Sequence, residues 1–282
     1  MVVLVAGGSG QLGQSLQFIA KDYPEMIFHF YDSAALDVAD LEKCRSVFAE
    51  IRPDFCINVA AYTAVDKAES EPEKACLINV EGAANLAGAC REFNTILIHI
   101  STDFVFDGNQ RRPYTEEDPT NPKSVYGKTK LDGEKAIQEA WEKHIIIRTS
   151  WLYSQFGNNF LKTMIRLGQE RDTLNVVNDQ TGTPTNAIDL ARAIAHTCRS
   201  KDLELKYGIY HYSNEGECTW FDFAKEIFEL HQISVDLKPI PTSDYPTPAE
   251  RPKYSVLDKS KIKAAFGCEI PNWKESLRHL IY

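Results

Sequence analysis

The sequence has no apolar run of the roughly 20 residues that a membrane-spanning helix needs, and its first apolar run is too short for a signal peptide. Positive charge is also scarce, because 31 Lys and Arg residues stand against 40 Asp and Glu residues, for a net charge of −9. No basic patch is present, which argues against a nucleic-acid-binding protein. We therefore expect a cytoplasmic protein that binds neither membranes nor nucleic acids.

Paired metal-ligand spacings are missing as well. The seven cysteines occur singly, mostly within helix or strand patterns, and the seven histidines are scattered. Cysteines used in this way are typical small core residues of a reducing compartment. The sequence therefore predicts no metal site.

Apolar residues make up 43% of the 282 residues, which is ample for a large core. Short continuous apolar runs alternate with helical patterns over the first 150 residues, and strands buried on both faces of a parallel sheet show such runs. This pattern predicts an α/β fold with a Rossmann-like, doubly wound parallel sheet. The expected strands are 2–6, 27–32, 55–60, 95–101 and 144–150, with helices near 40–51 and 73–93 between them.

The rhythm changes beyond residue 150, where the polar and aromatic segments WLYSQFGNNF and NDQTGTPT interrupt the alternation. We interpret the change as a smaller, discontinuous substrate-binding lobe. Residues 1–149 and about 170–205 would form the dinucleotide-binding domain. Residues about 150–169 and 206–282 would form mainly the lobe.

Three glycines, Gly7, Gly10 and Gly13, stand between the first strand and an amphipathic helical pattern. A strand, a glycine turn and a helix N-terminus make the dinucleotide-binding arrangement, in which the first amide groups of the helix hold phosphate. The Gly-x-x-Gly-x-x-Gly spacing resembles that of the short-chain dehydrogenase superfamily. The alternative is an ordinary strand–turn–helix corner.

Asp32 ends the second expected strand, about nineteen residues beyond Gly13. A carboxylate there can accept hydrogen bonds from the adenosine ribose hydroxyls. The next cation along the chain is Lys43, so a 2′-phosphate would meet Asp32 with no obvious charge to offset the repulsion. We therefore expect NADH to be used at least as well as NADPH, unless Asp32 is only a solvated strand-end carboxylate.

Tyr126 is the only one of the twelve tyrosines with a lysine, Lys130, four residues later. Good helix formers surround the pair, so both side chains should share a helix face, where the ammonium would lower the pKa of the phenol. Such a phenol can exchange a proton with a carbonyl or alcohol oxygen. Thr102 ends an expected strand at the sheet edge where doubly wound folds bind ligands. Its hydroxyl could hydrogen-bond the substrate oxygen to which Tyr126 supplies a proton. The alternative is an exposed helix pair.

Six segments carry a resemblance that spans the whole chain: NVAAYTAVDKAE, STDFVFDG, YGKTK, RTSWLYSQFGNNF, NDQTGTPT and RPKYSVLD. In this order they are similar to the dTDP-4-dehydrorhamnose reductases, extended short-chain dehydrogenases of deoxysugar biosynthesis. The resemblance implies that NADPH or NADH reduces the 4-keto group of dTDP-6-deoxy-L-lyxo-4-hexulose to give dTDP-L-rhamnose. It makes Tyr126 the proton donor and Lys130 the ligand of the nicotinamide ribose, while Thr102 orients the keto oxygen.

The resemblance also implies a wider set of contacts. Trp151 would be a flat platform for the sugar or would only pack the lobes together, and Arg251 would clamp the diphosphate or pair with a nearby acidic loop. Besides Asp32, the implied cofactor contacts are Gly7, Gly10, Gln11, Leu12, Gly13, Asp37, Val38, Ala60, Ala61, Thr63, Tyr126 and Lys130. The implied substrate contacts are Val65, Asp103, Phe104, Trp151, Asn159 and Arg251.

Two positions depart from the family pattern. Phe104 stands where members often have tyrosine, which removes a hydroxyl from the expected substrate site. Ser15 stands where some relatives have a glutamate that serves a magnesium-linked dimer, so magnesium is doubtful, and either a monomer or a homodimer is compatible with the sequence.

Two other functions compete with the reductase. A nucleotide-sugar epimerase or dehydratase shares the glycine loop and the Tyr/Lys pair, although NDQTGTPT and RTSWLYSQFGNNF fit a reductase better. The regulatory β subunit of methionine adenosyltransferase keeps the Tyr/Lys segment but is a binding partner. This chain retains Trp151, Asn159 and the Gly182–Pro184 segment, which a sugar site is expected to need.

Overall fold

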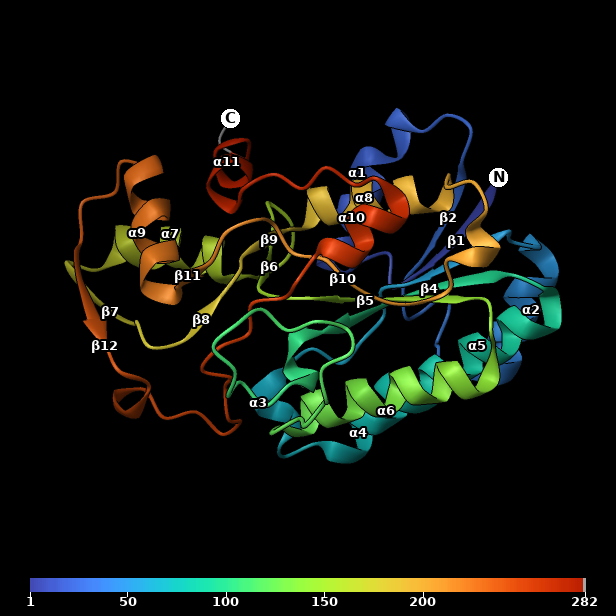
Figure 1. Cartoon of the computed structure of the whole chain (residues 1–282), viewed down its shortest axis with the longest axis horizontal. Helices are drawn as coiled ribbons and strands as arrows, with labels where there is room; N and C mark the ends of the chain where they lie inside the picture. The colour runs from blue at the N-terminus through green and yellow to red at the C-terminus, as the bar shows by residue number, and fades with distance from the viewer. Residues whose placement is uncertain (281–282) are drawn as a thin grey trace.

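A six-stranded sheet, in which every neighbouring pair is parallel, forms the centre of the computed structural model, which describes residues 1–280 (Figure 1). Its strands are β1 (Val2–Ala6), β2 (Ile27–Tyr31), β3 (Phe55–Asn58), β4 (Ile96–Thr102), β5 (His144–Thr149) and β10 (Gly208–His211). The spatial order is β10-β5-β4-β3-β1-β2. The strand order reverses at β1, and doubly wound folds bind ligands outside the carboxyl ends of the strands at such a reversal, here β1 and β3.

Strand β1 shows why helices cover both faces of the sheet. Val3 and Val5 belong to one buried cluster, and Leu4 and Ala6 belong to another. Successive side chains of a strand point to opposite faces, so an all-apolar strand needs cover on both. The first cluster includes residues of α1 (Gln11–Ile19), α8 (Ala187–Cys198) and α10 (Ser260–Phe266), and the second includes α2 (Leu41–Ile51), α5 (Gly82–Phe93) and α6 (Val125–Ala140).

The predicted strands and helices of the first 150 residues are confirmed, with one irregularity in the expected helix 73–93. That segment is α4 (Pro72–Cys76), a π-helical turn (Leu77–Glu81) and α5. π-helical turns occur often at functional sites. Asn79, within the turn, is buried and becomes important below.

A smaller lobe lies at one end of the molecule (Figure 1). Its core gathers buried side chains from α7 (Phe160–Glu170), α9 (Trp220–Leu230), α11 (Trp273–Arg278) and β7 (Thr173–Val177). β7 pairs in parallel with β12 (Asp236–Ile240), and β8 (Thr181–Gly182) pairs antiparallel with β11 (Cys218–Thr219). The remaining elements are α3 (Val65–Ala68), β6 (Leu152–Tyr153), β9 (Thr185–Asn186) and short 3-10 turns at Ala20–Asp22, Asp103–Val105, Leu203–Leu205 and Thr242–Asp244.

Two strands, β7 and β10, belong to a different part of the fold from the one in which they were expected. β7 pairs within the smaller lobe, although residues 170–205 were expected in the dinucleotide-binding domain. β10 extends the central sheet beside β5, and α10 packs on that sheet, although both fall within 206–282. The physical reason is that the run GIYH forms a parallel ladder with β5 at the edge of the central sheet, where Tyr210 and His211 are buried. The division into two lobes otherwise stays a prediction. Within residues 1–280, no helix is long and apolar enough to cross a membrane.

Candidate active site

The glycine corner between β1 and α1 leaves no room for side chains. Gly7 has a φ of 91°, and a Cβ there would lie 2.6 Å from the amide nitrogen of Ala60. A Cβ on Gly13 would lie 2.4 Å from the carbonyl oxygen of Gly7. Gly10 is the N-cap and brings no capping side chain, so the first amide groups of α1, including those of Gln11 and Leu12, stay available to a ligand. The residues present therefore fit a pyrophosphate at this corner.

Replacing Gly13 with alanine is expected to weaken NADH binding at least tenfold. The new methyl group would push α1 away from the glycine turn, a kind of overpacking that costs about 1–3 kcal/mol. Gly88→Ala is the matched control, because a Cβ at Gly88 meets nothing within 4 Å. Fluorescence titration with NADH and thermal unfolding of both variants would check the prediction, and equal affinities would contradict it.

The acidic end of β2 lies beside this corner, since the amides of Gly7 and Gly8 both donate to the carbonyl of Tyr31. Asp32 is exposed, and its Oδ1 accepts from the backbone amides of Ala34 and Ala35 at 3.0 and 2.9 Å. Among residues 1–280, Asp32 has no salt bridge with a lysine or arginine. Of the other predicted cofactor contacts, Asp37 is exposed and Val38 is buried.

The loop after β3 carries Ala60, Ala61 and Thr63 to the same edge of the sheet, and Asn79 of the π-helical turn holds this loop. Asn79 accepts from the amide of Tyr62 at 2.9 Å and donates to Thr129 of α6 at 3.1 Å. One buried amide thus joins the predicted cofactor loop to the helix that carries Tyr126. Nothing in the sequence distinguishes Asn79 from other asparagines, because its role depends on contacts 17 and 50 residues away.

Helix α6 brings Tyr126 to the end of β4. Ser124 caps the helix by accepting from the amide of Gly127, and a Cβ on Gly127 would lie 2.2 Å from the carbonyl oxygen of Phe104. The helix start therefore sits directly against the segment after β4. The hydroxyl of Tyr126 lies beside that of Thr102, and its ring meets that of Phe104 edge-on at 5.6 Å between centroids. The structure brings Thr102, Phe104 and Tyr126 together as predicted.

The expectation that Lys130 lowers the pKa of Tyr126 is wrong for this structure. Burial raises the pKa of Tyr126 to about 12, and the charge of Asp103 adds to the rise, while the bond with Thr102 opposes it. Lys130 Nζ instead donates to the carbonyl of Ile100 at 2.7 Å and lies 3.1 Å from His99 Nε2. A phenol with a raised pKa stays protonated at neutral pH, which is the form that a proton donor needs.

Asp103 is buried beside this pair, and Thr102 donates to its Oδ1 at 3.1 Å. Burial raises the pKa of Asp103 to about 6, although hydrogen bonds from Ser255 and Thr102 oppose the rise. Arg251 pairs with Asp66 at 2.7 Å, and its guanidinium lies 6.0 Å from the centre of the Phe104 ring. Arg251 is thus next to the predicted substrate contacts, but its ion partner is an aspartate of α3. Val65, half-buried, begins the same helix.

Two predicted substrate contacts are engaged with other protein groups. Trp151 stacks on Trp220 with ring centroids 3.6 Å apart, which occupies one face of the expected sugar platform and favours packing of the lobe. Trp151 also has a φ of 46°, a conformation that non-glycine residues seldom adopt. Asn159 caps α7 and donates to Gln11 Oε1 at 2.7 Å, so it connects the lobe to the glycine corner.

Among residues 1–280, no group of three or more His, Cys, Asp or Glu side chains is placed to hold a metal ion. Ser15 is buried, and its hydroxyl donates to the carbonyl of Gln11 within α1. These observations give magnesium no support.

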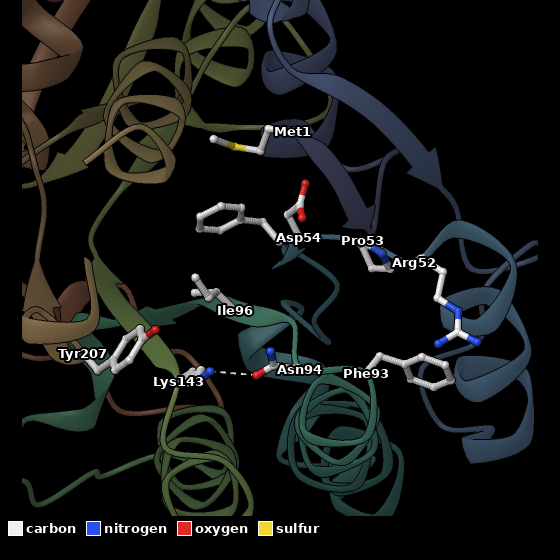
Figure 2. A pocket seen from close by; sticks show the side chains of 10 residues that line it. Met1, Arg52, Pro53, Asp54, Phe93, Asn94, Ile96, Lys143 and Tyr207 are labelled. Atoms are coloured by element: carbon white, nitrogen blue, oxygen red, sulfur yellow. Dashed lines mark hydrogen bonds between the residues drawn. The ribbon is translucent and has the colours of Figure 1, made fainter. Parts of the chain in front are cut away.

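A surface hollow of about 610 Å³ lies at the opposite edge of the sheet (Figure 2). Met1, Asp54, Ile96 and Lys143 line it, and all of them stand at or beside the amino ends of strands. The predicted site residues lie at the carboxyl ends. The hollow is therefore separate from the candidate active site.

A doubly wound sheet with a glycine corner at the order reversal, and with a tyrosine, lysine and threonine around the end of β4, defines an extended short-chain dehydrogenase/reductase. The model of the RmlD substrate binding domain family matches residues 1–282. The chain belongs to the dTDP-4-dehydrorhamnose reductase family of nicotinamide-dependent oxidoreductases.

Individual relatives are similar to this chain over nearly its whole length. The dTDP-4-dehydrorhamnose reductase of Sinorhizobium fredii is 41% identical, covering 100% of this chain and 97% of its own. The crystal structure of a dTDP-4-dehydrorhamnose reductase from Clostridium acetobutylicum has a TM-score of 0.95 at 43% identity, with 100% and 98% of the chains covered. The Bacillus anthracis enzyme, solved in complex with NADP, has a TM-score of 0.94 at 40% identity, with 99% and 98% covered.

Proposed function

We propose that the protein reduces the 4-keto group of dTDP-6-deoxy-L-lyxo-4-hexulose to give dTDP-L-rhamnose. The observation that carries the proposal is the meeting of Thr102 and Tyr126 at the carboxyl edge of the sheet, next to a glycine corner that fits a pyrophosphate. The full-length similarity to dTDP-4-dehydrorhamnose reductases supports this choice of substrate.

The nicotinamide cofactor supplies the hydride, and the protein's own groups supply the proton and the alignment. Tyr126 holds a proton at its phenol oxygen and donates it to the 4-keto oxygen as the alcohol forms. Thr102 lies beside Tyr126 and so can orient the same oxygen. Lys130 donates hydrogen bonds to the nicotinamide ribose, and the amides at the start of α1 bind the pyrophosphate.

Arg251 is the residue that we propose binds the substrate diphosphate. Its guanidinium is 22% exposed and lies over Phe104, whose ring touches Tyr126, so an anion held there would put the attached sugar close to the proton donor. A planar guanidinium can bind a diphosphate with two parallel hydrogen bonds. Binding there requires Arg251 to exchange its contact with Asp66 for one with the substrate.

We expect NADH to support at least the same kcat/KM as NADPH, because a 2′-phosphate would approach the exposed carboxylate of Asp32. The Bacillus anthracis relative was solved with NADP, so the preference is proposed for this chain alone. Loss of reduced-nicotinamide absorbance with the keto sugar would be followed separately with each cofactor. Asp32→Asn is expected to shift the ratio about tenfold toward NADPH by removing roughly 1.4 kcal/mol of repulsion. A wild-type protein that strongly prefers NADPH would contradict the assignment.

A further inference from the structure

A buried chain of hydrogen bonds runs beneath the candidate active site from the loop after β3 to Lys130. Ala60 N–H donates to Asn58 Oδ1 at 3.1 Å, which turns the amide nitrogen of Asn58 toward His99 Nδ1 at 3.0 Å. On the other side of the imidazole ring, His99 Nε2 lies 3.1 Å from Lys130 Nζ. Asn58, His99 and Lys130 are each 1% exposed, so water cannot substitute for any of these partners.

The donor-to-acceptor direction of these hydrogen bonds fixes the tautomer of His99. Because the Asn58 amide nitrogen can only donate, His99 Nδ1 must accept, and a neutral ring then carries its proton on Nε2. That N–H points at Lys130 Nζ. An ammonium has three donors and no acceptor, so two donors would face each other if Lys130 were charged. With Lys130 as a neutral amine, its lone pair accepts from His99 and its N–H donates to the Ile100 carbonyl.

The surroundings of Lys130 favour the neutral amine above about pH 8. Burial lowers the pKa of Lys130 to about 8, opposed by Glu134 one turn along the same helix. Glu134 is itself paired with Arg148 of β5 at 2.7 Å, so much of its charge is neutralised. The charge of Asp103, directly after β4, helps to raise the pKa of Tyr126. Burial lowers the pKa of His99 well below its usual range, so the ring is neutral.

We propose that His99 is a positioning residue that, at mildly alkaline pH, holds Lys130 as a neutral amine until the nicotinamide cofactor binds, so that cofactor binding takes up a proton. Lys130 would leave His99, accept a proton from solvent at Nζ, and donate the resulting ammonium hydrogens to the ribose hydroxyls. The inference rests on cofactor binding at this site, as proposed above. It adds a residue that links the protonation of Lys130 to loading of the active site.

Isothermal titration of the protein with NADH, in buffers of different ionisation enthalpy, measures this proton uptake. Since the pKa of Lys130 is about 8, most of the cofactor-free protein at about pH 8.5 carries the neutral amine, and uptake of roughly 0.7 proton per NADH is expected. NADH lacks the titratable 2′-phosphate of NADPH. His99→Gln should lower the uptake below roughly 0.2 proton, because a glutamine carbonyl can accept from a charged Lys130 in the free protein.

His144→Gln is the matched control, because His144 is a buried histidine of the same sheet that contacts the Trp141 carbonyl. It should keep the wild-type uptake. Asn58→Asp is a second test that does not alter His99. Its carboxylate would accept from Nδ1–H, so Nε2 could accept from a charged Lys130, and the uptake should again fall.

The titration results decide between the inference and the proposed function as separate questions. Wild-type protein that binds NADH without proton uptake overturns the inference, as does His99→Gln or Asn58→Asp with the full wild-type uptake. If His99→Gln fails to fold, Asn58→Asp and the wild-type value decide. Folded wild-type protein that gives no binding heat with either NADH or NADPH overturns the proposed function instead.

Discussion

Tyr126→Phe should lower kcat by about two to four orders of magnitude, the usual contribution of a positioned general acid. This loss corresponds to about 2.7–5.4 kcal/mol in the barrier. The phenylalanine ring keeps the edge-on contact with Phe104, so the change removes only the hydroxyl beside Thr102. NADH affinity should stay within about threefold of wild type, because the proton donor acts on the sugar. Steady-state kinetics together with fluorescence titration separate the two effects.

Tyr207→Phe provides the control for this experiment. Tyr207 is also half-buried, but it lines the hollow at the opposite edge of the sheet (Figure 2). Its substitution should leave kcat unchanged. Turnover of Tyr126→Phe close to that of Tyr207→Phe would remove Tyr126 from the role of proton donor.

Glu134→Gln should reduce the free energy of unfolding by about 3–5 kcal/mol, because it leaves the buried charge of Arg148 without its partner. Glu134 and Arg148 are 1% and 3% exposed, and both Nε and Nη2 of Arg148 donate to the carboxylate. Ser101 of β4 donates to the same carboxylate. The pair therefore fastens α6, with Tyr126 and Lys130, to two strands of the sheet, so kcat should fall as well. Urea unfolding would measure the loss of stability.

The control is Glu139→Gln on the exposed face of the same helix, which should change stability by less than about 0.5 kcal/mol. A double variant, Glu134→Leu with Arg148→Met, should recover much of the lost stability, since apolar replacement of a buried pair is often neutral. Equal midpoints for Glu134→Gln and Glu139→Gln would show that the pair is not needed to hold the helix.

The parts of the site that depend on short sequence spacings could be predicted. Tyr126 was expected on a helix with Thr102 close by, because four-residue spacing and the end of an apolar strand are local signals. The glycine corner was predictable for the same reason, since Gly7 and Gly13 meet each other and the next loop within one tight turn.

The direction of the Lys130 side chain could not be predicted, because it depends on His99, which is 31 residues away in the chain. A helix pattern places two side chains on one face, but it does not say which of several buried acceptors a lysine will reach. The stacking of Trp151 on Trp220 has the same origin, since it joins residues of two distant segments.

The strand β10 was misplaced for a different reason. A strand of only four residues, GIYH, fits the edge of a large sheet or the core of a small lobe equally well, and only pairing with β5 decides between them.

Transfer of deuterium from NADH labelled at both C4 positions to dTDP-6-deoxy-L-lyxo-4-hexulose tests the central claim most directly, with the product examined by NMR. The account predicts dTDP-L-rhamnose with one deuterium at C4 of the sugar and one NADH consumed for each sugar reduced. An epimerase would return the hydride to the sugar and leave the total NADH unchanged. A sugar without deuterium at C4, or no consumption of NADH or NADPH by folded protein that binds them, would contradict the proposed reaction.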